Sequence, residues 1–448
     1  MSANAAAVGG ARGTGPLRLR PVAAVLVMAA VIGLLVGRFA LAGDGAAPAT
    51  PVHRPTATVD RLQAELRARG ADPHLLTQLG VAYLAKARET ADPSWFTKSA
   101  DALGQASATR SSDPTTLTAL ALLDLARHDF GGALARGQLA HQVAPLSADA
   151  LGVIVDAEVE LGRYDDAAES AQQMVDRRPS LASFSRISYL RELHGDTAGA
   201  LTAMTQAAAA GSGSAADTAY VRTLIGDLHL NAGRLDDAED QYRRTLADDP
   251  NYGMAQYGTA RVAAARGDLD RAAGVLTPLV ARLPFPAWVA LLGDVEAARG
   301  RAADASHQYD LVRTIEQLNR ANGVAVDLEL ARFEADHARD PGADASAVVA
   351  MARAALAERP TIYAEDAMGW ALRQAGRPAE ALPHARAAVR LRTADASLWY
   401  HLATVEADLG LSVPAAADLA RAFSINRFST VRDLPAVRDL AAALGVTP

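Results

Sequence analysis

Cysteine is absent from the 448 residues, and Lys86 and Lys98 are the only lysines. A chain without thiols cannot form disulfides, use a thiolate nucleophile or bind a metal through sulfur. Aromatic residues make up only 5% of the chain, which suits helices packed on alanine and leucine. The preference for arginine over lysine, together with the abundance of alanine, indicates a GC-rich gene of bacterial origin.

Motifs of catalytic chemistry are also missing from the sequence. No G-x-S-x-G elbow is present, and the ten histidines form no H-E-x-x-H pair. Glu334, Asp336, His337 and Asp340 crowd one segment, but residues that follow each other so closely cannot all face one point. We interpret this segment as a solvated helix end rather than a metal site. The sequence therefore predicts a protein that is not an enzyme and that holds no cofactor and no metal.

The stretch 219–252 contains a helix, a turn and a second helix. Leu224 and Leu228 lie on one face of the first helix. Gly233 then ends that helix, because glycine accepts the positive φ of a helix C-terminus. Pro250 ends the second helix, since proline has no N–H to donate. Neither short helix can bury its apolar face alone, so the unit requires copies of itself.

Copies of this unit recur along the chain at a period of about 34 residues. The turn glycine of each copy is followed five residues later by alanine. These glycines are Gly162, Gly195, Gly233, Gly267, Gly300, Gly376 and Gly410. With this period and this helix-turn-helix content, residues 74–430 resemble the tetratricopeptide repeat (TPR) family.

The resemblance implies an all-α fold, a right-handed superhelical solenoid of about ten TPR-like repeats. We expect the solenoid to occupy residues 59–430, with a short leading helix at its start and a degenerate copy at 326–358. The second helix of the seventh repeat is expected to continue through Asn319, because no proline stops it. Residues 431–448 are amphipathic and are expected to form a capping helix over the last repeat.

The N-terminal region is expected to place the repeats outside the cytoplasm. Residues 1–20 form a basic tail, residues 21–42 an apolar segment, and residues 43–58 a linker rich in glycine, alanine, proline and threonine. At about 1.5 Å per residue, the apolar segment would be roughly 31 Å long, enough to cross a bilayer as a signal anchor with its N-terminus in the cytoplasm. The alternative is a signal peptide cleaved after Ala42, which would make the protein secreted.

The resemblance also implies a concave groove, lined by the first helix of each repeat, in which a protein or peptide partner lies. Aromatic and arginine side chains are the usual anchors of such recognition. Alignment of the repeats places twelve candidates in the groove: Tyr189, Tyr220, Thr223, Asp227, Tyr257, Arg261, Asp294, Tyr363, Asp366, Trp370, Arg373 and Tyr400. The competing interpretation is that several of them simply pack between repeats.

Trp370 is expected to be the main anchor, exposed off the apolar stripe of its helix, with Arg373 three residues later on the same face. The lysine and asparagine pair with which some family members clamp a C-terminal carboxylate is missing. Without residues 1–42 the net charge changes from −7 to −11, which argues against a nucleic-acid partner.

These observations together predict a non-catalytic protein-interaction scaffold. One alternative is an accessory ligand-binding or assembly-chaperone subunit of a cell-envelope transporter or complex. Another alternative is a secreted TPR binding protein. A third is a cytoplasmic regulator, which the N-terminal segment disfavours.

Overall fold

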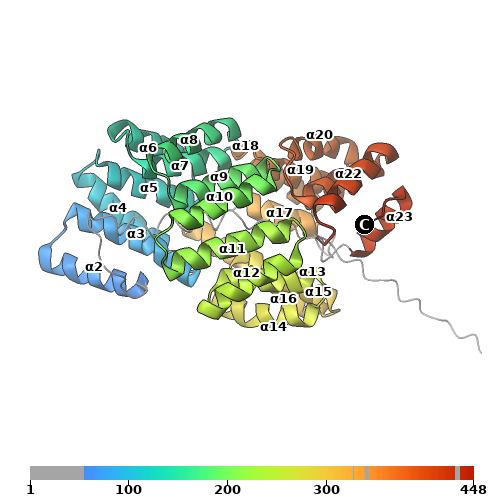
Figure 1. The fold of residues 1–448 in the computed structure, drawn as a ribbon, viewed down its shortest axis with the longest axis horizontal. Coiled ribbons are helices and arrows are strands. Elements are labelled where there is room, and N and C mark those ends of the chain that lie inside the picture. The colour runs from blue at the N-terminus through green and yellow to red at the C-terminus, as the bar shows by residue number, and fades with distance from the viewer. Residues whose placement is uncertain (1–54, 326, 339–342, 429–433, 448) are drawn as a thin grey trace, which may run out of the picture.

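The computed structural model describes residues 55–325, 327–338, 343–428 and 434–447. These residues form 22 α-helices and, within the described ranges, no β-strand (Figure 1). The expected all-α class and the repeating pairs of helices are confirmed. The segment 21–42, predicted to cross a membrane, lies outside the described residues.

Ten helix pairs follow one another along the chain. The first helices of the pairs are α3 (Pro73–Thr90), α5 (Pro114–Ala126), α7 (Ala148–Glu160), α9 (Leu181–Leu193), α11 (Ala215–Asn231), α13 (Gly253–Ala265), α15 (Pro286–Ala298), α17 (Asp327–His337), α19 (Ile362–Gln374) and α21 (Ala396–Asp408). The second helices are α4 (Ser94–Thr109), α6 (Phe130–Val143), α8 (Tyr164–Arg177), α10 (Thr197–Ala210), α12 (Leu235–Asp248), α14 (Leu269–Arg282), α16 (Ala302–Ala321), α18 (Ala345–Glu358), α20 (Pro378–Ala388) and α22 (Ser412–Ile425).

The turn inside each pair follows from its glycine. All seven predicted turn glycines have φ between 69° and 80°, the left-handed region that the sequence analysis expected. The backbone N–H of Gly162 bonds to the carbonyl of Val159, which closes the helix end. His128 takes the same position in the second repeat, with φ of 61°.

The alanine that follows each turn glycine marks a close helix crossing. Ala167, for example, is fully buried where α8 crosses α7. At the predicted crossing of α11 and α12, a Cβ added to Gly226 would lie 2.6 Å from the Cε1 atom of Tyr242. A larger residue at either crossing would force the two helices apart, so the small residues set their separation.

Neighbouring repeats stack so that their first helices lie on the inner side. α5 contacts α3 and α7, and α19 contacts both α17 and α21, whereas each second helix packs mainly on the first helices beside it. The first helices of neighbouring repeats therefore lie next to one another, as the repeat pattern predicts.

The chain then curves until its C-terminal repeats lie against its earlier ones. In Figure 1, α18 lies beside α8 and α19 beside α9. Hydrogen bonds join segments about 200 residues apart, among them Ala325 N to Arg127 O at 2.8 Å, Ile362 N to Tyr164 Oη at 3.0 Å, Thr393 Oγ1 to Leu193 O at 2.5 Å, and Asn426 Nδ2 to Leu230 O at 2.8 Å. We call this contact the inter-turn seam.

The seam is apolar as well as hydrogen-bonded. Ile362 and Leu398 from the later repeats pack with Val159, Tyr164 and Leu193 from the earlier ones in one buried cluster. Burying large aliphatic side chains in this way contributes on the order of 1.5–3 kcal/mol each. The earlier and the later repeats, which form the two turns of the superhelix, therefore pack directly against each other.

The ends of the array differ in detail from the expected boundaries. Helix α2 (Pro55–Arg69) begins before Val59, inside the segment predicted as linker, and Leu62 packs on the first repeat. Helix α23 (Leu434–Leu444) lies at the other end, with Val437 buried against the last repeats. Among the described residues, no helix combines the length and the apolar character that a membrane crossing requires.

Candidate protein-interaction surface

All twelve predicted groove residues lie on first helices: α9, α11, α13, α15, α19 and α21. Nine of them are buried, however, and only Arg261, Tyr363 and Arg373 keep part of their surface exposed. Most of these side chains are therefore held by contacts within the chain. The structure favours packing for this majority.

Buried pairs of an acid and a base connect successive first helices. Each pair joins the first helices of two neighbouring repeats, and the pairs recur at every second repeat. The four pairs are Asp156 on α7 with Arg186 on α9, Asp227 on α11 with Arg261 on α13, Asp294 on α15 with His337 on α17, and Asp366 on α19 with His401 on α21. The N-terminal two use arginine and the C-terminal two use histidine.

The Asp156–Arg186 pair has bidentate geometry. Nε of Arg186 donates to Oδ1 of Asp156 at 2.9 Å, and the terminal Nη2 donates to Oδ2 at 2.7 Å. Nη1 donates to the carbonyl of Ala182, so most of the buried guanidinium is satisfied. Burial raises the pKa of Asp156, while the charge of Arg186 opposes that shift. The pair fixes the angle between α7 and α9.

The Asp227–Arg261 pair contains two of the predicted groove residues. Arg261 donates to Oδ1 of Asp227 at 3.0 Å, and the hydroxyl of Tyr242 donates to the same oxygen at 2.7 Å. Burial raises the pKa of Asp227, and Arg261 partly offsets the increase. Arg261 also donates to Asn231, whose amide donates to Glu192 on α9. The network thus spans three consecutive repeats.

The expected solvated helix end at Glu334–His337 is wrong for two of its members. Asp336 and His337 are buried, and Nε2 of His337 lies 3.6 Å from Asp294, which also accepts a 2.9 Å hydrogen bond from Tyr309. Glu334 instead pairs with Arg313. The helix end packs under α15 and α16, and this removes it from water. Asp340 lies outside the described residues.

No group of three or more histidine, aspartate or glutamate side chains within the described ranges is arranged to hold a metal ion. Four buried acids, Asp156, Asp227, Asp294 and Glu192, instead contact arginine, tyrosine or asparagine side chains on neighbouring helices. These contacts order the repeats, because each fixes two helices relative to one another.

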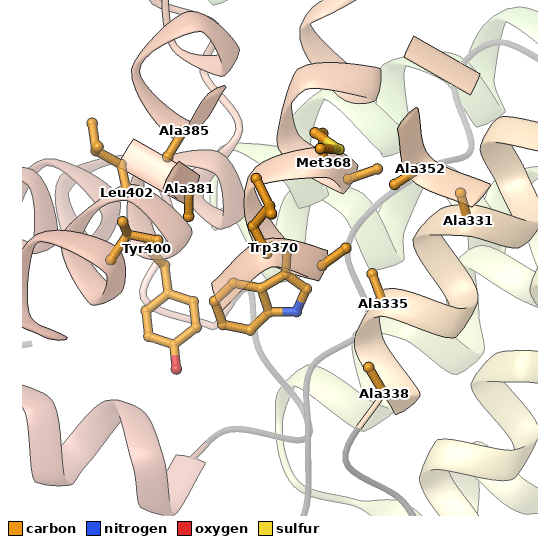
Figure 2. Packing of buried hydrophobic residues seen from close by; sticks show 14 of the residues in the cluster. Ala331, Ala335, Ala338, Ala352, Met368, Trp370, Ala381, Ala385, Tyr400 and Leu402 are labelled. Atoms are coloured by element: carbon orange, nitrogen blue, oxygen red, sulfur yellow. The ribbon is translucent and has the colours of Figure 1, made fainter. Parts of the chain in front are cut away.

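Trp370 is not the exposed anchor that the sequence analysis expected. Its side chain is only 3% exposed, and its ring stacks on His401 with centroids 4.0 Å apart. Figure 2 shows the indole between Tyr400 on α21 and two alanines, Ala335 on α17 and Ala338 just after that helix. The prediction failed because the face of α19 that points away from its partner helix α20 is covered by the neighbouring first helices, α17 and α21.

The three partly exposed candidates also contact neighbouring side chains of this chain. The guanidinium of Arg373 lies 4.8 Å from the Trp370 ring and donates to Asp408 at 2.7 Å. Tyr363 lies under Arg332 with 4.9 Å between guanidinium and ring. Of the predicted set, these side chains and Arg261 are the ones that a partner can reach in this conformation.

The basic partners of the buried acids went unrecognised in the sequence. Arg186 and His401 follow their aspartates by 30 and 35 residues, close to one repeat length, and this spacing was a usable signal. His337 follows Asp294 by a longer interval because α16 is extended to Ala321. When an acidic and a basic residue lie one repeat apart on first helices, the spacing predicts that they pair with each other rather than remain free to bind a partner.

An exposed apolar stripe on the outer side was also missed. Leu139 and Val143 on α6 and Leu146 just after it follow the i, i+4, i+7 spacing of one helix face, and Leu146 is 76% exposed. The signal was visible in the sequence, because α6 carries only Arg136 and His141 as ionisable residues. Exposed apolar side chains are common on protein surfaces, so these three carry no functional assignment by themselves.

Comparison with protein families supports the helical-repeat geometry. The tetratricopeptide repeat family matches residues 118–182, 153–215, 191–253, 223–285 and 367–425, which together cover just over half of the chain. The chain belongs to the tetratricopeptide repeat family. The first repeat, the seventh repeat at α15 and α16 and the degenerate copy at α17 and α18 lie outside these matches.

One curated relative resembles a short part of this TPR protein. Cellulose synthase 1 operon protein C of Komagataeibacter xylinus is 34% identical over 98 residues, which are 22% of this chain and 7% of the relative. The TPR protein thus spans far less than two thirds of the relative's length. The similarity describes a shared stretch rather than the whole of either protein.

Three solved structures show partial likeness to this chain. A thermophilic TPR protein of Thermus thermophilus has 21% identity and a TM-score of 0.39, covering 43% of this chain and 98% of its own. The APC/C hetero-tetramer Cut9–Hcn1 has 14% identity and a TM-score of 0.35, covering 87% and 93%. A monomeric IFIT1 mutant with Gppp-AAAA has 12% identity and a TM-score of 0.46, covering 75% and 76%.

Proposed function

We propose that this TPR protein is a non-catalytic scaffold that binds a protein or peptide partner on the inner surface of its array. The observation that carries the proposal is the row of first helices on which Arg261, Tyr363 and Arg373 keep part of their surface exposed. Arginine and tyrosine are enriched among the residues that dominate protein interfaces. A rigid row of this kind recognises a partner with little ordering cost.

The chemistry of these residues favours a partner with acidic and apolar groups. Arg373 already lies between an aromatic face and a carboxylate, so an incoming carboxylate would compete with Asp408 for the guanidinium. Tyr363 would offer an apolar ring next to Arg332. The acidic body of the chain makes a nucleic-acid partner unsuitable.

We further propose that the array acts outside the cytoplasm, held by residues 21–42 as a signal anchor. The support is the uncharged run 22–37, which follows three arginines at positions 12, 18 and 20. A reporter enzyme fused after Pro448 is expected to be active only outside the cytoplasm. A mature protein shorter by about 42 residues would indicate cleavage after Ala42 and a secreted protein instead.

A second candidate is an accessory subunit of a cell-envelope complex. The relative in Komagataeibacter xylinus is named for a cellulose synthase operon, and the shared stretch is 34% identical. In this proposal the array would hold other subunits of an envelope assembly together. It predicts crosslinks to a constant set of envelope proteins, whereas a soluble-peptide binder would crosslink to many.

Photo-crosslinking in the native cell tests the inner surface. A photoreactive residue at Tyr363 is expected to give a defined protein adduct identifiable by mass spectrometry. The matched position is Val413 on the outer helix α22, which is more exposed than Tyr363. Equal adducts from both positions, or none from Tyr363 in a folded protein, would remove the inner surface from the proposal.

A further inference from the structure

The inter-turn seam contains a cluster of ionisable side chains that spans both turns of the superhelix. Arg359, in the loop before α19, reaches Glu160 at the end of α7 and lies 3.0 Å from Glu329 on α17. His128, in the turn before α6, lies 3.6 Å from Glu329. Two carboxylates therefore share one arginine, and the nearby imidazole carries a charge only when it is protonated.

The same cluster is enclosed by further charged and hydroxyl groups. Asp156 lies on the same helix as Glu160, and Tyr164 is the first residue of the following helix, α8. Burial raises the pKa of Glu160 to about 7, and the charge of Arg359 opposes this only in part. Burial also acts on Glu329, but Arg359 and His128 outweigh it and lower the pKa of that carboxyl. Glu329 thus remains charged while Glu160 titrates near neutrality.

A second acidic site lies one repeat further along the seam. Glu192, at the end of α9, adjoins Leu193, whose carbonyl accepts the hydrogen bond from Thr393 in the loop before α21. Asp395, the N-cap of α21, follows in that same loop. Carboxyl groups from both turns therefore meet at this point of the seam.

The environment of these two carboxyls is mixed in charge. Glu192 accepts a hydrogen bond from Asn231 at 2.9 Å and faces Asp227 and Arg261 as well as Asp395. Burial raises the pKa of Glu192 to about 7, with Asp227 and Asp395 adding to the shift. Burial likewise raises the pKa of Asp395, which is bonded by Ser397 and faces Arg332 and Asp366.

We propose that the inter-turn seam is a pH-dependent latch that is closed while Glu160 and Glu192 are protonated and loosens when they ionise. Above neutral pH the cluster at Arg359 holds two carboxylates for one arginine, and Glu192 and Asp395 repel each other across the seam. Buried charge of one sign disfavours the closed state. Opening separates α19 and α21 from α7 and α9 and uncovers Ile362 and Leu398.

The absence of cysteine allows the latch to be tested in the full-length protein with a single pair of introduced labels. Asp166 on α8 and Glu358 on α18 are exposed and lie close in sequence to the contact between Gly162 and Pro360. Spin labels on Asp166→Cys and Glu358→Cys report the distance across the seam by pulsed electron paramagnetic resonance. Labels on Asp270→Cys and Asp304→Cys, on the second helices α14 and α16 of two successive repeats, form the reference pair.

Between pH 6 and pH 8.5, the seam pair is expected to gain a longer-distance population while the reference pair stays constant. Glu160→Gln combined with Glu192→Gln should hold the seam pair at its short distance at both pH values. Asp418→Asn is the matched control, because burial also raises the pKa of Asp418, to about 6, on α22 outside the seam. This control should leave the pH response intact.

Three results would overturn the latch. One is an unchanged seam distance over this pH range in the wild-type chain. Another is a response that survives in the double glutamine variant or disappears in Asp418→Asn. The third is a loss of helical circular dichroism in parallel with the distance change, because that would mean unfolding rather than opening.

Discussion

Nδ1 of His401 lies 2.8 Å from Oδ1 of Asp366, and the same imidazole stacks on Trp370. One histidine therefore joins α19 to α21 both by a hydrogen bond and by ring contact. The arrangement explains why the tryptophan is buried, since His401 on the next helix covers its face. It also makes this site a part of the repeat interface, where a partner cannot bind without separating two repeats.

Trp370→Ala is expected to destabilise the protein by about 3–5 kcal/mol, because the substitution leaves a cavity between three first helices. Urea unfolding followed by circular dichroism measures this change. Leu146→Ala is the control, since Leu146 is mostly exposed and should change stability very little. If Trp370→Ala left the unfolding midpoint unchanged, the buried position of the indole would be contradicted.

Arg186→Ala is expected to cost about 3–5 kcal/mol, because it leaves the carboxylate of Asp156 buried without its charged partner. Replacing both residues, with Arg186→Met and Asp156→Leu, should recover most of this loss. The two variants are compared by urea unfolding at pH 7. A double variant as unstable as Arg186→Ala would mean that the arginine acts through packing rather than by charge neutralisation.

Comparing Gly162→Ala with Gly376→Ala distinguishes the stability lost by a clash across the seam from the stability lost by strain in the turn itself. Both glycines have positive φ, so alanine strains each backbone by roughly 1–2 kcal/mol. A Cβ at Gly162 would also strike the carbonyl oxygen of Pro360 across the seam, whereas one at Gly376 would meet nothing within 4 Å. Gly162→Ala should therefore be clearly the less stable variant in thermal unfolding, and equal losses would argue against a tightly packed seam.

Glu316→Gln should flatten the pH dependence of stability. Burial raises the pKa of Glu316 from 4.5 to about 7, although Asn319 donates a hydrogen bond to it. Between these values the folded chain holds a proton that the unfolded chain has released, so the free energy of unfolding falls as pH rises. The full effect is up to roughly 3 kcal/mol from pH 4.5 to above pH 7. Urea unfolding at pH 5 and pH 8 measures the slope in both proteins, and an unchanged slope in the variant would assign the titration to other groups.

The local pattern of this protein is contained in its sequence. A glycine that must adopt positive φ, an alanine where two helices cross and a period near 34 residues are constraints that act within one repeat. They predicted the helix pairs and the first helices as the inner side, and the missing proline predicted the long α16, which ends at Ala321. They also placed every candidate groove residue on a first helix.

Only the tertiary structure decided what those residues contact. The pairing of Asp366 with His401 depends on the rotation between successive repeats, and the contact of Arg359 with Glu160 depends on the sum of such rotations over several repeats. Each rotation is small and arises from packing between side chains of different repeats, so no single repeat encodes the pitch of the superhelix. The pitch brings the later turn onto the earlier one, and this contact buries residues that a repeat taken alone would leave exposed.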